Sequence, residues 1–241
     1  MSGFLGVLGG MGPLATADFL RKLVENTMAA QDQEHIPVLM YGDCTTPDRT
    51  ASIVGRGVSP LPKLLEGIRF LDRAGAQAIC IPCNSAHHWY DDMAAASSVP
   101  VLHIAQASVD EVRRKMPEAR VVGVMSTLGT YETGLYRNAL HTHGYEVLAP
   151  TRGEFDTLVS PGIADVKANL IDAASRSFSV AAQSLLDRGA DIIILGCTEI
   201  PLGMQRQVRA NPSLYVDSND ALAVAAVRFF ESGESRQQLR A

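Results

Sequence analysis

The sequence predicts an α/β protein of two similar domains with mainly parallel sheets, related by a pseudo-twofold axis, with the active site between them. Two observations lead to this expectation. Short apolar or β-branched runs alternate with longer segments of helical periodicity, which is typical of strand–helix–strand units with buried strands. A stretch near residue 80 is also repeated near residue 195, and such internal similarity indicates two equivalent halves.

Six runs are expected to form strands, because each is short, apolar or β-branched and separated from the next by a helical pattern. They are residues 4–8, 38–41, 78–81, 121–125, 146–148 and 192–195. A last stretch contains a strand at residues 214–216, a turn at Asp217 and an apolar helix that reaches Phe230. We expect this stretch to return to the first half and complete it.

The repeat is closest around two cysteines. Residues 74–83 read AGAQAICIPC and residues 188–197 read RGADIIILGC, so Gly75 precedes Cys83 by eight residues and Gly189 precedes Cys197 by eight. A weaker match relates the segment that starts at residue 6 to the one that starts at residue 123. The first domain is therefore expected to comprise residues 1–99 with about 209–241, and the second residues 100–208.

Composition and charge exclude several function classes. The chain of 241 residues is 46% hydrophobic and 20% charged, with a net charge of -5, and no basic cluster alternates with aromatics as a nucleic-acid groove would require. No run approaches the roughly 18 apolar residues of a membrane span, and the apolar N-terminus lacks the basic flank and cleavage site of a signal peptide. We expect a cytoplasmic protein with no nucleic-acid or membrane partner, in which four cysteines do not form a disulfide framework.

Cys83 and Cys197 are the strongest candidates for chemistry. Both follow expected parallel strands at their carboxyl ends, where ligands bind in open α/β sheets. Polar residues that can open a helix follow each one, at 84–85 and 198–199. A helix N-terminus lowers the pKa of a thiol and can hold a carboxylate. Two such thiols facing each other would supply the two acid/base groups of a racemase.

Other interpretations of the cysteines are less favoured. We expect Cys44 and Cys80 to be small core residues, the usual fate of a free cysteine. Cys80 and Cys83 form a C-x-x-C pattern, but an extended chain would place their Cα atoms roughly 10 Å apart, beyond the roughly 7 Å limit of a disulfide. Cys83 and His87 could share a metal on a helix, yet no second ligand pair is present and a structural zinc site is not expected.

A glycine pattern after the first strand offers a rival function. Gly10, Gly12 and Ala15 match G-x-G-x-x-A, with Asp43 near the end of the second strand, as in nicotinamide-dependent enzymes. Pro13 has a structural use as the first residue of a helix. Because this pattern leaves the cysteine repeat unexplained, we rank it second. A non-catalytic amino-acid-binding protein is a third possibility, but binding requires neither thiol.

Longer motifs carry a family resemblance. PCNSAHH at 82–88 and GCTEIP at 196–201 resemble the Asp/Glu racemase superfamily, which is independent of pyridoxal phosphate. GGMGPLATA at 9–17, DQEH at 32–35, PDRT at 47–50 and VKAN at 166–169 are similar to its aspartate racemase branch. Glutamate racemases resemble the chain less, since they have Asp-Ser where this chain has Gly9 and Gly10, and His where it has Glu199.

The resemblance implies a reaction and a site. It implies interconversion of L- and D-aspartate by catalytic Cys83 and Cys197, without a cofactor or metal, in a homodimer; glutamate, hydantoin or maleate remain alternative substrates. The substrate-binding residues that it implies are Arg49, Asn84, Ser85, Thr127, Lys167 and Thr198.

Specific roles follow for most of these residues. Arg49 and Lys167 would neutralise the side-chain carboxylate, whereas Asn84, Ser85 and Thr198 would hold the α-carboxylate and the amino group. Ser85 replaces the more usual threonine and keeps the hydroxyl. From the residues alone, Arg49 could equally pair with Asp48, and Lys167 could lie on a solvent face.

Overall fold

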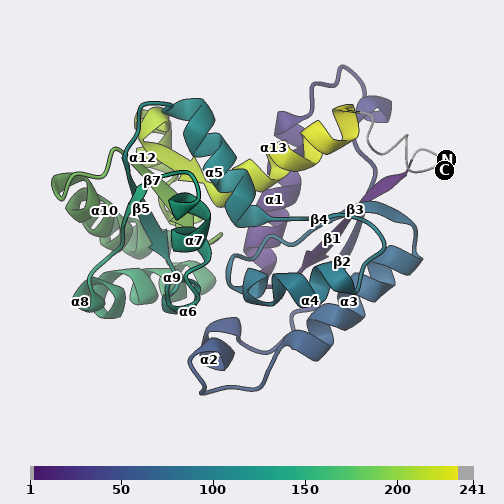
Figure 1. The fold of residues 1–241 in the computed structure, drawn as a ribbon, viewed down its shortest axis with the longest axis horizontal. Coiled ribbons are helices and arrows are strands. Elements are labelled where there is room, and N and C mark those ends of the chain that lie inside the picture. The colour runs from purple at the N-terminus through teal and green to yellow at the C-terminus, as the bar shows by residue number, and fades with distance from the viewer. Residues whose placement is uncertain (1–2, 233–241) are drawn as a thin grey trace.

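The computed structural model describes residues 3–232 and has two lobes, each built on a four-stranded parallel sheet (Figure 1). The first sheet has the order β2-β1-β3-β4 and the second the order β6-β5-β7-β8. The strands are β1 (Phe4–Gly9), β2 (Val38–Gly42), β3 (Ala76–Cys80), β4 (Val101–Leu102), β5 (Val121–Ser126), β6 (Glu146–Leu148), β7 (Ile192–Gly196) and β8 (Tyr215–Asp217). The predicted fold class is confirmed, and each of the six expected strands overlaps an observed one.

Helices cover both faces of each sheet. The α-helices of the described residues are α1 (Pro13–Asn26), α2 (Arg49–Ile53), α3 (Leu61–Arg73), α4 (Tyr90–Ala95), α5 (Ile104–Lys115), α6 (Leu128–Glu132), α7 (Leu135–His141), α8 (Arg152–Glu154), α9 (Ser160–Lys167), α10 (Ile171–Asp187), α11 (Ile200–Gly203), α12 (Gln205–Ala210) and α13 (Ser218–Glu231). Short 3-10 helices are η1 (Asp32–Glu34), η2 (Ser85–Trp89) and η4 (Pro212–Leu214), and η3 (Phe155–Val159) is a π-helix. None of these helices, within residues 3–232, is long and apolar enough to cross a bilayer.

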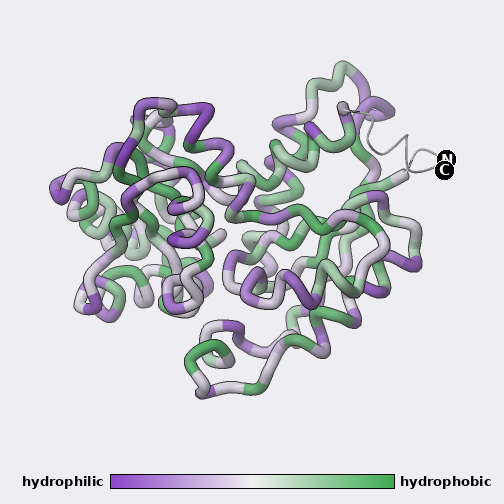
Figure 2. Tube along the Cα trace, in the orientation of Figure 1, coloured by the Kyte–Doolittle hydropathy of each residue, from purple (hydrophilic) through white to green (hydrophobic). Residues whose placement is uncertain are grey.

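Alternation along the strands distributes apolar side chains between two cores on either side of each sheet. In β7, Ile192 and Ile194 pack with α5 and α7, whereas Ile193 and Leu195 pack with α9 and α10. All four are fully buried, so this strand has no solvent face. Figure 2 shows the same arrangement as hydrophobic segments inside both lobes and hydrophilic segments at their edges.

The chain crosses between the lobes twice, and both crossings differ from the predicted domain boundaries. β4 pairs with β3 in the first sheet, although residues 101–102 were expected in the second domain. β8 pairs with β7 in the second sheet, although residues 215–217 were expected in the first. The two residues of β4 are too few to carry a periodic signal, and the strand expected at 214–216 carries no local signal of the sheet that it joins. We propose boundaries after β4 and after β8; residues 233–241 of the expected first domain lie outside the described residues.

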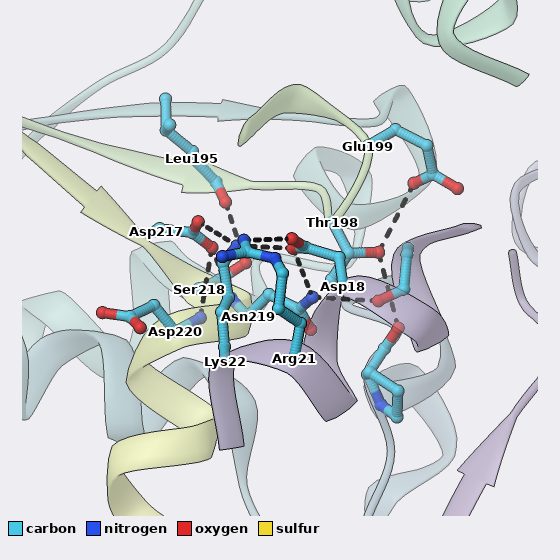
Figure 3. A network of polar contacts seen from close by, with 12 residues as sticks. Asp18, Arg21, Lys22, Leu195, Thr198, Glu199, Asp217, Ser218, Asn219 and Asp220 are labelled. Atoms are coloured by element: carbon cyan, nitrogen blue, oxygen red, sulfur yellow. Dashed lines mark hydrogen bonds and ion pairs between the residues drawn. The ribbon is translucent and has the colours of Figure 1, made fainter. Parts of the chain in front are cut away.

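After β8 the chain returns to the first lobe through α13, which packs beside α1 (Figure 1). A buried polar network joins the start of α13 to α1 (Figure 3). Lys22 forms ion pairs with Asp18, at 2.5 Å, and with Asp217. Asn219 Nδ2 donates to the carbonyl of Ala15 at 3.0 Å and to Asp18 Oδ2 at 3.1 Å. Burial opposes the charge on Lys22, but the two carboxylates outweigh it and raise the Lys22 pKa. This network connects the two lobes, because Lys22 belongs to α1 and its partner Asp217 to β8.

Candidate active site

The two sheets have equivalent switch points. In each sheet the second strand of the chain lies on one side of the first strand and the third strand lies on the other side. The switch point is therefore between β1 and β3 in the first sheet and between β5 and β7 in the second. Ligands in open α/β sheets bind outside the carboxyl ends at such points. Cys83 follows the end of β3 by three residues, and Cys197 follows β7 directly. Gly75 and Gly189, which precede these strands, both have positive φ angles, +93° and +96°, so the sequence repeat is a structural repeat.

One cavity between the lobes contains all eight predicted site residues. Its lining residues are Met11, Asp48, Arg49, Thr50, Cys83, Asn84, Ser85, Thr127, Ile163, Lys167, Cys197, Thr198 and Glu199. The cavity measures about 30 Å³, about the room that two water molecules need. A larger cavity of about 330 Å³ shares Asp48, Arg49, Lys167 and Glu199 with it and therefore adjoins it.

Cys197 is a buried thiol paired with a carboxylate. Its side chain is 5% exposed, and Sγ donates to Oε2 of Glu199 at 3.1 Å. Burial raises the Cys197 pKa well above its usual range and the Glu199 carboxylate raises it further, whereas the Glu199 backbone amide and then Lys167 oppose both. The predicted lowering of this pKa is therefore wrong. Helix α11 has only four residues, so its dipole is too small to offset desolvation.

Cys83 is held through its backbone by a buried histidine. Nε2 of His87 accepts from the amide of Ile104 at 3.2 Å, so Nδ1 carries the proton and donates to the Cys83 carbonyl at 2.9 Å. Burial and the neighbouring His103 lower the His87 pKa to about 3, which keeps the ring neutral. His87 thus holds the backbone at Cys83. The element after Cys83 begins as a 3-10 helix rather than an α-helix.

Arg49 is fixed by backbone carbonyls. Its guanidinium donates to the carbonyl oxygens of Thr46, Pro47 and Met11 at 3.2, 3.0 and 3.3 Å. Asp48 does not form the local ion pair considered from the sequence, because it caps α2 by accepting from the amide of the third residue after it at 2.7 Å. Nε of Arg49 is buried and has no hydrogen-bond partner among the described residues. Three of the five guanidinium hydrogens are thus engaged by backbone carbonyls, which preorganises the side chain.

The cation of Arg49 is electrostatically coupled to Cys83. Burial disfavours its charge, but Cys83 and then the nearby carboxylates more than offset this, and the Arg49 pKa is raised. Lys167 lies at the end of α9, exposed to solvent while also lining the cavity. Lys167 is thus placed where it can reach both solvent and the cavity, and its role toward a substrate stays a prediction.

Hydroxyl groups from both lobes meet beside the thiols. Ser85 Oγ lies 2.9 Å from Thr127 Oγ1 and 2.9 Å from Thr130 Oγ1, and Thr127 and Thr130 are 3.0 Å apart. Thr198 is buried, with its hydroxyl 3.4 Å from the Pro82 carbonyl oxygen and 3.4 Å from Glu199 Oε2 (Figure 3). These contacts place neutral donors around the cavity, as a carboxylate ligand requires.

Sequence reasoning missed two residues of the site, Glu199 and Thr130. Glu199 was noted as a polar residue after Cys197 and as a difference from glutamate racemases, but not as a partner of the thiol, although an acidic residue two positions after a candidate thiol is itself a signal. Thr130 comes from the helix turn after Thr127 and has no sequence signal. Cys44 was predicted to be buried and is exposed, because it lies in the loop after β2; Cys80 is buried as predicted.

The glycine pattern serves close packing in this structure. A Cβ atom at Gly10 would lie 2.6 Å from the carbonyl carbon of Asp43, and one at Gly12 would lie 3.1 Å from Glu199 Oε1. Thr16 closes the loop by accepting from the Gly10 amide at 3.0 Å, and Pro13 is the first residue of α1, as expected. Among the described residues, no group of three His, Cys, Asp or Glu side chains could hold a metal ion.

Fold and site together define the class of this protein: two similar parallel α/β halves bring one thiol each to a shared interdomain cavity, as in amino-acid racemases of the Asp/Glu type. The chain belongs to the Asp/Glu/Hydantoin racemase family, whose sequence profile matches residues 8–226. The resemblance predicted from its motifs is confirmed.

Individual relatives extend over nearly the whole chain. The aspartate racemase of Picrophilus torridus superimposes with a TM-score of 0.83 at 28% identity, covering 97% of this chain and 98% of that one. The broad specificity amino-acid racemase RacX of Bacillus subtilis is 26% identical over 234 residues, which are 96% of this chain and 100% of that protein. The glutamate racemase of Methylococcus capsulatus is 28% identical over 230 residues, 89% of this chain and 74% of that protein.

Proposed function

We propose that this protein racemises aspartate, with Cys83 and Cys197 as acid/base groups on opposite sides of the substrate Cα. The observation that carries the proposal is that these two buried thiols line one cavity with the guanidinium of Arg49. The Picrophilus relative supports aspartate as the substrate.

The environment of Cys197 supports its role as the acid. Burial and the Glu199 carboxylate raise the Cys197 pKa, which keeps this thiol protonated, and the guanidinium of Arg49 lies beside Cys83. Cys83 is then the base for one enantiomer and Cys197 the acid. The Cα–H bond breaks as its proton passes to Cys83, and the resulting carbanion takes a proton from Cys197, which becomes the thiolate. Glu199 can accept the Cys197 proton when the reaction runs in the other direction.

Charge supports an acidic substrate. A side-chain carboxylate that leaves water needs a cation, and Arg49 and Lys167 both line the cavity. Ser85, Thr127 and Thr198 supply hydroxyl donors for the α-carboxylate. The similarity to RacX supports a wider amino-acid range as the second candidate.

Chiral chromatography of L-aspartate incubated with pure protein tests the activity. We expect D-aspartate to form, and Cys83→Ser and Cys197→Ser, purified identically as controls, to be slower by about 10²- to 10⁴-fold. Alanine and glutamate, run in parallel, separate aspartate specificity from a broad range. Normal turnover in either variant would refute the two-thiol reaction.

Deuterium incorporation separates two bases from one. In D₂O, protiated L-aspartate should yield early D-aspartate that carries deuterium at Cα, while the remaining L-aspartate stays protiated, because opposite thiols remove and deliver the proton. A single base that serves both faces would carry protium into the earliest product.

A further inference from the structure

A chain of buried hydrogen bonds joins the segments that carry the two thiols. The Tyr136 hydroxyl donates to Oδ1 of Asn84 at 2.5 Å, and Nδ2 of Asn84 donates to Ser218 Oγ at 3.0 Å. Ser218 in turn donates to the carbonyl oxygen of Leu195 at 2.8 Å. These four residues are 3% exposed or less. The chain thus runs from α7 through the residue after Cys83 to strand β7, which ends beside Cys197.

The ring of Tyr136 also contacts strand β7, which directly precedes Cys197. A Cβ atom at Gly196 would lie 2.7 Å from Cε2 of Tyr136, so the ring occupies the space that only glycine leaves free. Tyr136 therefore contacts the residue before Cys197 with its ring and the residue after Cys83 with its hydroxyl.

The hydroxyl determines which way the Asn84 carboxamide points. Oδ1 can only accept a hydrogen bond, so a donating phenol holds it toward α7 and turns Nδ2 toward Ser218. Burial raises the pKa of Tyr136, which keeps the phenol protonated and able to donate. Nδ2 has a second hydrogen with no partner in residues 3–232, and Asn84 lines the cavity. That hydrogen is available to a substrate carboxylate.

We propose that Tyr136 is a positioning residue that orients the Asn84 carboxamide toward the substrate and sets the placement of Cys83 relative to Cys197. This inference rests on the proposed function, since its effect on turnover requires the racemase reaction. Tyr136 itself makes no contact with the reacting atoms.

A double-mutant cycle tests the route through Asn84. Tyr136→Phe removes the hydroxyl and with it the contacts to Asn84 Oδ1 and to Ser108 Oγ at 3.3 Å. Loss of the bond to the buried Asn84 should lower kcat/KM for aspartate by about 10- to 100-fold. In an Asn84→Ala background the same change should have no further effect, because Tyr136 acts through Asn84. Equal losses in both backgrounds would overturn the proposal. Tyr131→Phe, an exposed tyrosine of the same lobe, is the matched control and should keep wild-type kinetics.

Alkylation by iodoacetamide provides a readout that does not need turnover. Mass spectrometry of the cysteine peptides should show several-fold faster modification of Cys83 in Tyr136→Phe, with exposed Cys44 unchanged as internal reference. An unchanged Cys83 rate would overturn the positioning role. A parallel rise at fully buried Cys80 would overturn it too, because it would reveal general loosening.

The kinetic and alkylation experiments also distinguish a failure of this inference from a failure of the proposed function. If wild-type protein racemises no amino acid, the proposed function fails, and the alkylation rates still decide whether Tyr136 positions Cys83.

Discussion

Replacing Glu199 with glutamine tests how strongly this carboxylate controls the Cys197 thiol. Oε2 of Glu199 lies 3.1 Å from Sγ, and its charge disfavours a thiolate there. Two unit charges at that separation repel by about 5 kcal/mol at an effective dielectric constant of about 20. The carboxylate shares its charge between two oxygens and the surroundings relax, so we expect Glu199→Gln to lower the Cys197 pKa by about 1 to 3 pH units.

The rate of Cys197 alkylation at pH 8 measures this change. A fall of that size raises the thiolate fraction by about 10- to 1000-fold, while each thiolate becomes a weaker nucleophile with a Brønsted coefficient of about 0.4 to 0.5. The net gain should be about 3- to 50-fold. Iodoacetamide modification followed by peptide mass spectrometry resolves Cys197 from the other thiols. Glu118→Gln, at an exposed position, is the control and should leave the rate unchanged.

The pH profile of racemisation should also reflect the lower Cys197 pKa. Cys197 must be protonated to donate, so its pKa limits activity at high pH, and the alkaline limb of the pH profile should move to lower pH in Glu199→Gln. An unchanged alkylation rate together with an unchanged alkaline limb would refute the electrostatic coupling of Glu199 to Cys197.

Three further predictions concern charge and stability. Arg49→Gln should reduce kcat/KM for aspartate by about 10²- to 10³-fold more than for alanine, because only aspartate leaves a second carboxylate unpaired. His87 has a pKa of about 3 in the folded protein and a usual value of 6.5, so the unfolded state binds its proton first as the pH falls. The free energy of unfolding in urea should therefore fall below pH 6.5 by about 1.4 kcal/mol per pH unit. In His87→Asn this pH-dependent loss of stability should be absent. Lys22→Met removes the cation that Asp18 and the half-buried Asp217 share and leaves Asp18 with the exposed Arg21 as its ion-pair partner, so it should cost about 3 kcal/mol in urea unfolding at pH 7.

Matched variants make these measurements decisive. Arg56→Gln and His141→Asn alter exposed residues of the same type and should change neither the substrate preference nor the pH dependence of stability. Lys63→Met removes a partly exposed ion pair with Asp43 and should cost at most about 1 kcal/mol. Equal losses for aspartate and alanine, an unchanged pH slope in His87→Asn, or a cost for Lys22→Met no larger than for Lys63→Met would each contradict the corresponding prediction.

The architecture could be predicted because its signals are local in the chain. Buried strands such as residues 192–196 are continuous apolar runs, and the equal spacing of Gly75 and Gly189 from their cysteines reflects the same turn made twice. The two residues of β4 carry no such signal, and the strand expected at 214–216 has no local feature that shows which sheet it joins, so both pairings differ from the expected halves. The family motifs added Arg49 and Lys167, which periodicity alone could not have selected.

Only the tertiary structure decided how the site is electrostatically arranged. The Cys197 pKa depends on how completely Cys197 is buried and on Glu199 beside it, and desolvation outweighs the dipole of a four-residue helix. The contacts of Asn84 with Tyr136 and Ser218 join residues 52 and 134 positions apart in the chain. Sequence alone therefore determined the strands, the repeat and the pair of thiols. Burial and contacts between the lobes determined what surrounds each thiol, because both depend on segments that are distant in the chain and meet only when it folds.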